Sequence, residues 1–509
     1  MRTAYVNARV TTLDPSAPHA AGIVCAGGVV ERLLPEVPVG LPSHTQVVDC
    51  NGVAIVPGFH DCHVHLTDTG LLAGDHDMRD CSNVAAMVKR TEALCRAQGS
   101  SRDPIYAGNY EEAAIAEARP PTRIELDRVS GDVPVVLTRV DGHSSVANSA
   151  AFALLAIDGM DGVERDKSGS PTGGLRAAAN YAAQNGIVAA LSTEARRAAD
   201  MRAADIALRA GITTAHNVII GDEPFEALAD RYRRDAALPI RVISKSCSTD
   251  VRKVKRLGGR VFGGDIFVDG SIGSRTAAVS EAYRDGAGSG LLYLGADNLA
   301  ELFDEAAEQQ LSLGVHAIGD RAIEATIAAW ERVIAKRGPL KGVRPSIDHF
   351  EIAADDQIAR AAKCGMLLSM QPAFDLLWGG QGGMYEQRLG APVARSMNRF
   401  KTAKRAGCTI CAGSDSPVTP FSALLGIRAL MNHNVADERF TLEEALRAYT
   451  TDAAALSFDE GRRGMLAPGY DADFVALEHG LDTLPPAEID SVRVLMTVIA
   501  GEIRLDQMR

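Results

Sequence analysis

A helix followed by a strand recurs along most of this 509-residue chain, and this repetition limits the fold more than any other feature. "STEARRAADMRAADIALRAGITTAHN" opens with a Ser/Thr cap, runs as a helix to Gly211 and becomes a strand. "DNLAELFDEAAEQQLSLGVHAIGD" repeats the plan, with Gly314 as the expected helix stop. "TLEEALRAYT" begins with a capping box, Thr441 to Glu444. Repeated helix–strand units predict an α/β protein with a parallel sheet. Over this length, the sheet is expected to close into a (β/α)₈ barrel of the TIM type.

More segments resemble barrel strands than a barrel of eight can hold. The ten candidates are "IVPGFHDCHVHL", "PIYAGNY", "PVVLTRVDGH", "ITTAHN", "IRVISKS", "DIFVDGS", "LSLGVHAIGD", "PSIDHFE", "GMLLSMQPA" and "CTICAGSD". Two of them must therefore belong to an insertion or lie outside the barrel. The interval from about 67 to 205 is longer than an ordinary βα unit, so we place the insertion there.

The two ends of the chain differ in their sequence pattern from its middle. Residues 1–56 and 465–509 consist of short alternating strands broken by Gly and Pro. Because chain termini often lie close together, the two ends are expected to form one small β-sandwich. The predicted organisation is then an N-terminal sandwich part, a barrel over 57–464 and a C-terminal sandwich part.

Composition excludes several classes of function. The net charge of −12 argues against a nucleic-acid partner, since phosphate binding needs clustered Lys and Arg. No apolar run is long enough for a membrane span, and the first residues lack the apolar core of a signal peptide. Nine scattered cysteines are typical of reduced thiols, so a cytoplasmic protein is expected. The sequence leaves the oligomeric state open, and only the general frequency of twofold assemblies favours a homodimer.

Polar residues suited to chemistry end most of the candidate strands. They are His63 and His65, His216, His316, His349 and Asp415. The C-terminal strand ends of a barrel face one common mouth, so these residues should converge. His63 and His65 share a strand face because side chains alternate with period two, whereas His60 points the other way and is read as a packing residue. Imidazole and carboxylate ligands with an open position suit a divalent ion such as Zn²⁺, which activates water.

Motifs along nearly the whole chain resemble one enzyme family. The pieces, in order, are "NARVTTLDP", "PGFHDCHVHL", "VDGHSSVANSAAF", "GITTAHN", "VDGSIGSRTA", "HAIGDRAI", "IDHFE", "MQP", "AGSDSPV" and "GMLAPGYDADFV". They resemble the amidohydrolase superfamily, in the branch called amidohydrolase 3 or YtcJ-like, which includes N-substituted formamide deformylases. The resemblance implies a metal-dependent barrel with a β-sandwich made from both chain ends. It also implies that His63, His65, His316 and His349 are metal ligands and that Asp415 is the catalytic aspartate.

The sequence departs from this family at two places. The branch usually has a lysine, carrying a carbamate that can bridge two metals, where this chain has Asp265. Asp265 could bridge a compressed pair of ions or bind one ion, or the site could be mononuclear without it. Lys245 is a candidate for the substitute donor, but a lone lysine at a strand end is more often a solvated charge or a substrate contact. Phe374 stands where the family often has a histidine, and with Trp378 it would make that wall of the pocket apolar.

The expected function is hydrolysis of a C–N bond of amide type in a small molecule. One or two divalent ions, zinc foremost, would provide hydroxide and polarise the carbonyl group. Asp415 would take the proton from the water and pass it to the leaving nitrogen, besides contacting the metal. His143 is the first candidate for a second oxyanion donor and His216 the next, while Arg275 could bind a substrate carboxylate.

Two other functions fit parts of the same pattern. A metal-dependent lyase, for example a decarboxylase, would use the same barrel and release CO₂ rather than an amine. A catalytically retired binding protein would explain the missing lysine, but the retention of four histidines and Asp415 argues against it.

Overall fold

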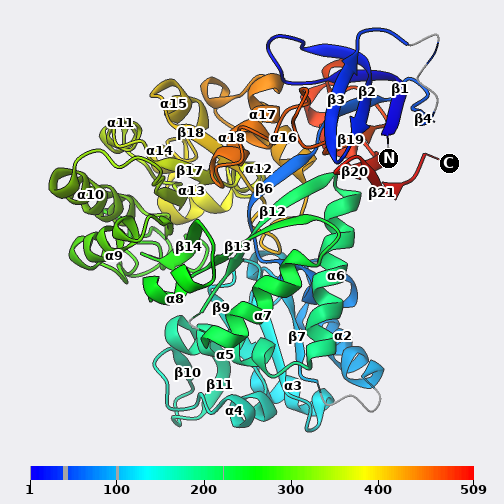
Figure 1. Ribbon diagram of the computed structural model, residues 1–509. Helices are drawn as coiled ribbons and strands as arrows, with labels where there is room; N and C mark the ends of the chain where they lie inside the picture. The colour runs from blue at the N-terminus through cyan, green and yellow to red at the C-terminus, as the bar shows by residue number, and fades with distance from the viewer. Residues whose placement is uncertain (1, 38–39, 41–43, 99–102, 222, 509) are drawn as a thin grey trace. The chain divides into compact units, whose positions relative to one another are not determined.

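The computed structural model describes residues 2–37, 40, 44–98, 103–221 and 223–508. The chain divides into two compact units (Figure 1). The main unit comprises the residues up to 64, those from 204 to 415 and those from 420 onward, and the insertion unit comprises residues 65–203 and 416–419.

Parallel strands with helices between them form the centre of the main unit. One hydrogen-bonded group joins β6 (Phe59–Val64), β12 (Ile212–Ile219) and β13 (Arg241–Ser246). The other group joins, in this order, β14 (Val261–Phe267), β15 (Ser312–Ala317), β16 (Ser346–His349), β17 (Leu367–Met370) and β18 (Thr409–Ala412). Contacts link β13 to β14 and β18 to β6. The predicted α/β class is confirmed, and the strand order is consistent with a (β/α)₈ barrel.

The helices that follow these strands begin and end for local reasons. The capping box predicted at Thr441 is confirmed: its hydroxyl accepts from the Glu444 N–H, and the Glu444 carboxylate accepts from the Thr441 N–H. The prediction that Gly314 stops a helix is wrong. Helix α9 (Ala296–Glu308) ends earlier, Gln310 takes a left-handed φ of 56°, and Gly314 lies inside β15. A Cβ on Gly314 would lie 2.9 Å from Oδ2 of Asp348, so glycine is required there by packing.

Strands from both ends of the chain share one sheet at another part of the main unit (Figure 1). The first residues supply β1 (Arg2–Thr11), β2 (His19–Ala26), β3 (Val29–Leu34), β4 (Thr45–Asp49) and β5 (Ala54–Pro57). The last residues supply β19 (Phe474–Leu477), β20 (Val494–Ile499) and β21 (Glu502–Asp506). The order is β21-β20-β19-β5-β1-β2-β3, with β4 also paired to β1.

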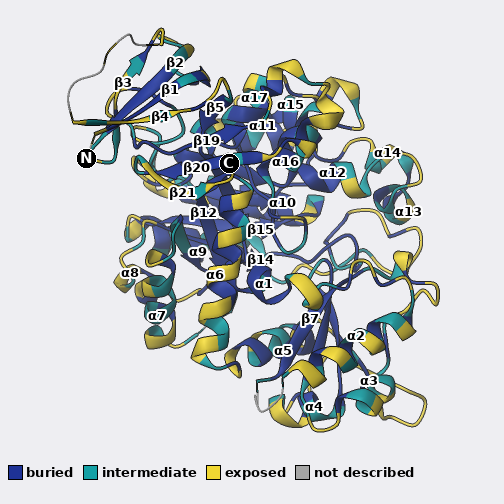
Figure 2. Cartoon of the chain, turned by 90° about the vertical axis from the view of Figure 1, so that its right-hand side faces the viewer, coloured by how far each residue is buried: buried dark blue, intermediate teal, exposed yellow. Residues whose placement is uncertain are grey.

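The core of this sheet is built from alternate residues of its strands. Tyr5 and Phe474, one from each end of the chain, meet edge to face with ring centroids 4.8 Å apart. Both side chains are at most 1% exposed, and the strands around them are mostly buried in Figure 2. Aromatic pairs of this kind add to the hydrophobic stabilisation of a core.

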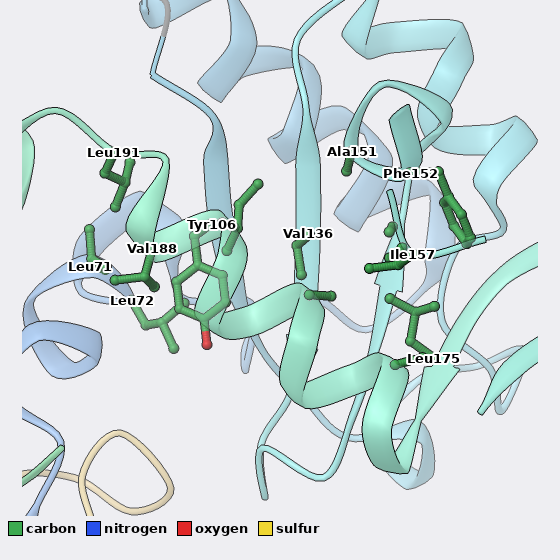
Figure 3. Packing of buried hydrophobic residues seen from close by; sticks show 14 of the residues in the cluster. Leu71, Leu72, Tyr106, Val136, Ala151, Phe152, Ile157, Leu175, Val188 and Leu191 are labelled. Carbon is green, nitrogen blue, oxygen red and sulfur yellow. The ribbon is translucent and has the colours of Figure 1, made fainter. Parts of the chain in front are cut away.

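The insertion unit has a sheet and a core of its own. Its sheet has the order β10-β11-β9-β8-β7. The strands are β7 (Ile105–Tyr110), β8 (Val135–Arg139), β9 (Ser144–Ala147), β10 (Val163–Arg165) and β11 (Pro171–Arg176). Tyr106, Val136 and Leu175 from these strands belong to one buried hydrophobic cluster, which also includes Leu71 of α1 (Leu66–Leu71) and Val188 of α5 (Ala177–Ala189) (Figure 3). Two of the ten candidate strands, "PIYAGNY" and "PVVLTRVDGH", therefore lie in this unit rather than with the parallel strands.

In the described part of the chain, every helix is too short or too polar to span a membrane.

Candidate metal centre

The carboxylate of Asp265 lies among three histidines from three other strands. Its Oδ2 is 3.4 Å from Nε2 of His63, and its Oδ1 is 3.4 Å from Nδ1 of His316 and 3.5 Å from Nε2 of His349. Asp415 extends the group, with Oδ1 3.4 Å from the same His63 nitrogen. Each of these side chains is less than 10% exposed. Residues far apart in sequence thus converge, as the pattern of strand ends predicts.

The ring nitrogen of each histidine that points away from Asp265 is held by a hydrogen-bond acceptor. Nδ1 of His63 donates to Oδ1 of Asp348 at 2.7 Å, and Nδ1 of His349 donates to Oε1 of Gln371 at 2.7 Å. Nε2 of His316 lies 3.2 Å from the carbonyl oxygen of Gly270. Metal-ligating histidines are commonly oriented in this way, because the outer hydrogen bond fixes the tautomer that leaves the inner nitrogen able to bind an ion.

The donor set fits a divalent metal ion. His63, Asp265 and His349 offer ligand atoms within 4.8 Å of one another. Nε2 of His349 is buried and lies 3.5 Å from Oδ1 of Asp265, so one ion could take both atoms as ligands. Imidazole nitrogens and carboxylate oxygens are the usual ligands of Zn²⁺ and related ions.

Charge at the centre favours binding of a cation. Burial lowers the pKa of His63, but the charges of Asp265 and Asp415 outweigh it and raise this pKa to about 10. Burial would also lower the pKa of His349, but the interaction with the Asp265 carboxylate outweighs burial and raises this pKa. Burial would raise the pKa of Asp265, but the charge of His63 and hydrogen bonds from the histidines hold it well below its usual range. The carboxylates thus attract positive charge, which is a proton in the absence of metal and can be a metal ion.

The backbone is strained where two site residues leave their strands. His349 has a φ of 75° and Asp415 a φ of 55°, both in the left-handed region that non-glycine residues rarely adopt. Asp415 is fixed there by its N–H, which donates to the His63 carbonyl at 2.7 Å. A second bond ties the same two strand ends, because the Asp61 carboxylate accepts from the Ser414 N–H at 3.0 Å. Burial raises the pKa of Asp61 to about 6 despite these bonds.

Two predicted site residues lie in the insertion unit. His65 follows β6 directly and is the first residue of that unit, where its N–H donates to the Ser416 carbonyl at 2.8 Å. His143 is buried, and its Nδ1 lies 2.6 Å from the hydroxyl of Tyr181. The roles predicted for both residues stay predictions.

Three further candidates belong to the main unit but have other neighbours. His216 is completely buried, and its ring meets that of His60 edge to face at 5.3 Å. Arg275 is partly exposed and its guanidinium forms two hydrogen bonds with Asp285, so a substrate carboxylate would have to replace that partner. Lys245 is 1% exposed, so the interpretation as a solvated charge is wrong. Its Nζ lies 3.6 Å from Oδ1 of Asp348.

An aromatic pair adjoins the centre on one side. The ring of Phe374 is parallel to that of His349, with 6.2 Å between centroids and 8° between planes. Trp378, one turn further along α12 (Pro372–Trp378), packs against Phe374 with ring centroids 4.9 Å apart. Phe374 is buried and Trp378 half-buried, which agrees with an apolar wall there.

Sequence reasoning missed Asp348 and Gln371. Both stand beside motifs that were recognised, in "SIDHFE" and "MQP". Period-two alternation would turn Asp348 away from the side of the strand that His349 occupies. The left-handed backbone at His349 breaks that alternation, so neighbouring residues both reach the centre.

Comparison with known proteins agrees with this geometry. The model of the amidohydrolase family matches residues 46–504. The chain belongs to the amidohydrolase family. It is 28% identical to the putative amidohydrolase YtcJ of Bacillus subtilis over 95% of this chain and 94% of that protein. It is 26% identical to N-substituted formamide deformylase of Arthrobacter pascens over 99% of this chain and 98% of that protein.

A solved structure of a metal-dependent hydrolase has the same fold. An uncharacterized metal-dependent hydrolase from Pyrococcus furiosus is 26% identical and superposes with a TM-score of 0.75, covering 96% of this chain and all of that one. The family, this neighbour and the cluster of candidate ligands together support a divalent metal ion at the centre.

Proposed function

We propose that this protein is a metal-dependent hydrolase that cleaves a C–N bond of amide type in a small molecule. The observation that carries the proposal is the convergence of His63, His316 and His349 on Asp265, with Asp415 beside His63. The relatedness to an N-substituted formamide deformylase supports a bond of this kind.

The ligands of the metal would be the predicted set of His63, His65, His316, His349, Asp265 and Asp415. Asp265, which stands where the family usually has a lysine, is well placed as a ligand, because its two carboxylate oxygens face different histidines. This placement suits either a bridge between two ions or one shared ion. Zinc is the ion we favour because of the nitrogen-rich donor set. When bound, the ion supplies water of lowered pKa and polarises the substrate carbonyl group.

Side chains of the protein would transfer the proton, contact the substrate and stabilise the oxyanion. The Asp415 carboxylate accepts a proton from the attacking water and delivers it to the leaving nitrogen, which then departs as an amine. Phe374 and Trp378 offer an apolar surface to the part of the substrate nearest His349. His143 and His216 remain the proposed oxyanion donors, and Arg275 the proposed partner of a substrate carboxylate.

Replacement of Asp415 tests this function. In Asp415→Asn, release of amine from a panel of N-substituted formamides and N-acyl amino acids should fall by about 100-fold or more, because the proton acceptor is lost. Asp297→Asn, which changes a highly exposed carboxylate, is the matched control and should keep its activity. Unchanged amine release in Asp415→Asn, or release of CO₂ instead of an amine from the wild-type reaction, would overturn the proposal.

A further inference from the structure

A lysine and an aspartate are buried as a charged pair behind the metal centre. Lys245 on β13 is 1% exposed and Asp348 on β16 is 0% exposed, with 3.6 Å between Nζ and Oδ1. Nζ of Lys245 and Oδ2 of Asp348 make no hydrogen bond to any described residue. Leaving either group buried without the other would be strongly unfavourable, so the two side chains hold each other in place.

The backbone around the pair is shaped to hold it. On β14, a Cβ added to Gly264 would lie 3.2 Å from Nζ of Lys245. On β15, a Cβ added to Gly314 would lie 2.9 Å from Oδ2 of Asp348. Two neighbouring strands therefore carry glycine where they pass the pair, and any larger residue would crowd it.

The pair reaches the metal centre through one hydrogen bond. Oδ1 of Asp348, the oxygen nearest Lys245, accepts from Nδ1 of His63 at 2.7 Å. An ionised carboxylate can only accept, so it keeps the His63 proton on Nδ1. Nε2, which faces Asp265 and Asp415, is then the nitrogen left to bind an ion. A protonated or neutral group at position 348 could donate instead and favour the opposite tautomer.

We infer that Lys245 is a positioning residue that pairs with Asp348, fixes its carboxylate as the acceptor of the His63 Nδ1–H and thereby keeps Nε2 of His63 turned towards the metal. The inference rests on the proposed function, because it concerns the same metal centre. It assigns Lys245 a role other than that of a carbamate ligand. In the carbamate alternative the lysine nitrogen would carry a carboxylate whose oxygens could contact the ion, and Asp348 would have no part in its effect.

Metal affinity in a double-mutant cycle separates the two roles. The Zn²⁺ dissociation constant would be measured by competition with a chromophoric chelator for the wild type, Lys245→Met, Asp348→Asn and the double variant. We expect each single change to weaken binding by about 10- to 100-fold, the usual effect of losing an outer partner of a metal-binding histidine. We expect the double variant to bind no more weakly than Asp348→Asn alone, because Lys245 acts only through Asp348.

Controls keep stability and chemistry apart. Lys253→Met also removes a largely buried lysine, one whose Nζ donates to the Glu223 carbonyl, and it should leave Zn²⁺ affinity unchanged. Circular dichroism would verify that each variant is folded. Added bicarbonate should not change the wild-type affinity, and ¹³C NMR after incubation with labelled bicarbonate should show no carbamate signal.

The possible results divide clearly. Unchanged Zn²⁺ affinity in folded Lys245→Met overturns the inference. The inference is also overturned if Lys245→Met weakens Zn²⁺ binding as much in the Asp348→Asn variant as it does in the wild type. A carbamate signal that Lys245→Met abolishes would overturn it too. Failure of the wild-type protein to bind Zn²⁺ at all would refute the proposed function instead, so the two failures are distinguishable.

Discussion

Replacing Gly413 by alanine should disturb the junction that places Asp415 beside His63. The added Cβ would lie 2.7 Å from the backbone nitrogen of His63 and 3.0 Å from Oδ1 of Asp61. The first distance is about 0.7 Å short of the 3.4 Å at which ordinary contact begins. Since the obstacle is backbone rather than a flexible side chain, β18 and β6 must move apart at their ends.

The expected cost of Gly413→Ala follows from that displacement. Overpacking of a well-filled interior costs about 1–3 kcal/mol, and the lower entropy of the unfolded alanine chain offsets about 0.4–1 kcal/mol. A net loss of about 1–2 kcal/mol in the free energy of unfolding is therefore expected. A shift approaching 1 Å at Asp415 should also lower hydrolysis by up to about 100-fold.

Urea unfolding followed by tryptophan fluorescence would measure the loss. Both tryptophans, Trp330 and Trp378, belong to the main unit, so the signal reports on the strands concerned. Gly461→Ala is the control, because the space around its added Cβ is open to 4 Å among the described residues. If Gly413→Ala and Gly461→Ala unfold at the same urea concentration and hydrolyse substrate equally fast, the argument from close contact is wrong.

Three further predictions concern the terminal sheet and the metal centre. Phe474→Ala should destabilise the protein by about 3–5 kcal/mol and speed hydrogen exchange in β1 and β20, whereas Ile503→Ala, at a 38% exposed position, should cost about 0.5 kcal/mol or less. Gln371→Leu should weaken Zn²⁺ binding by about 10- to 100-fold in a chelator competition because His349 loses its acceptor, and Gln371→Glu should weaken it less. Metal uptake at pH 7 should release protons, because neighbouring carboxylates outweigh burial and raise the pKa of His63 to about 10. Calorimetry in buffers of different ionisation enthalpy would detect those protons, and a Zn²⁺ affinity that does not fall as the pH falls would contradict the assignment.

The sequence was sufficient to locate the centre because strand ends have a fixed relation to one another. Once the helix–strand repeats indicated parallel strands, His316, His349 and Asp415 had to emerge on the same side as His63. The motif around Asp265 added a carboxylate to that group, although its contact with three histidines depends on side-chain geometry that no spacing rule provides.

The parts that sequence did not predict depend on tertiary packing. Asp348 and His349 both reach the centre because the backbone at His349 is left-handed, and no local pattern in "SIDHFE" predicts that conformation. Lys245 looked like a surface charge because its burial is decided by β14 and β15, which follow it in the chain. Gly314 looked like a helix stop because its packing partner, Asp348, is on another strand.

The sheet that joins both chain ends affects how the protein is made. Strands β1 and β5 leave the ribosome well before β19, the neighbour of β5, which begins only at residue 474. Until β19 has been synthesised, β5 presents an open edge to other nascent chains, and exposed edges of this kind promote aggregation. Completion of this sheet is therefore a late event in biogenesis, and a chain terminated before residue 474 would leave that edge permanently uncovered.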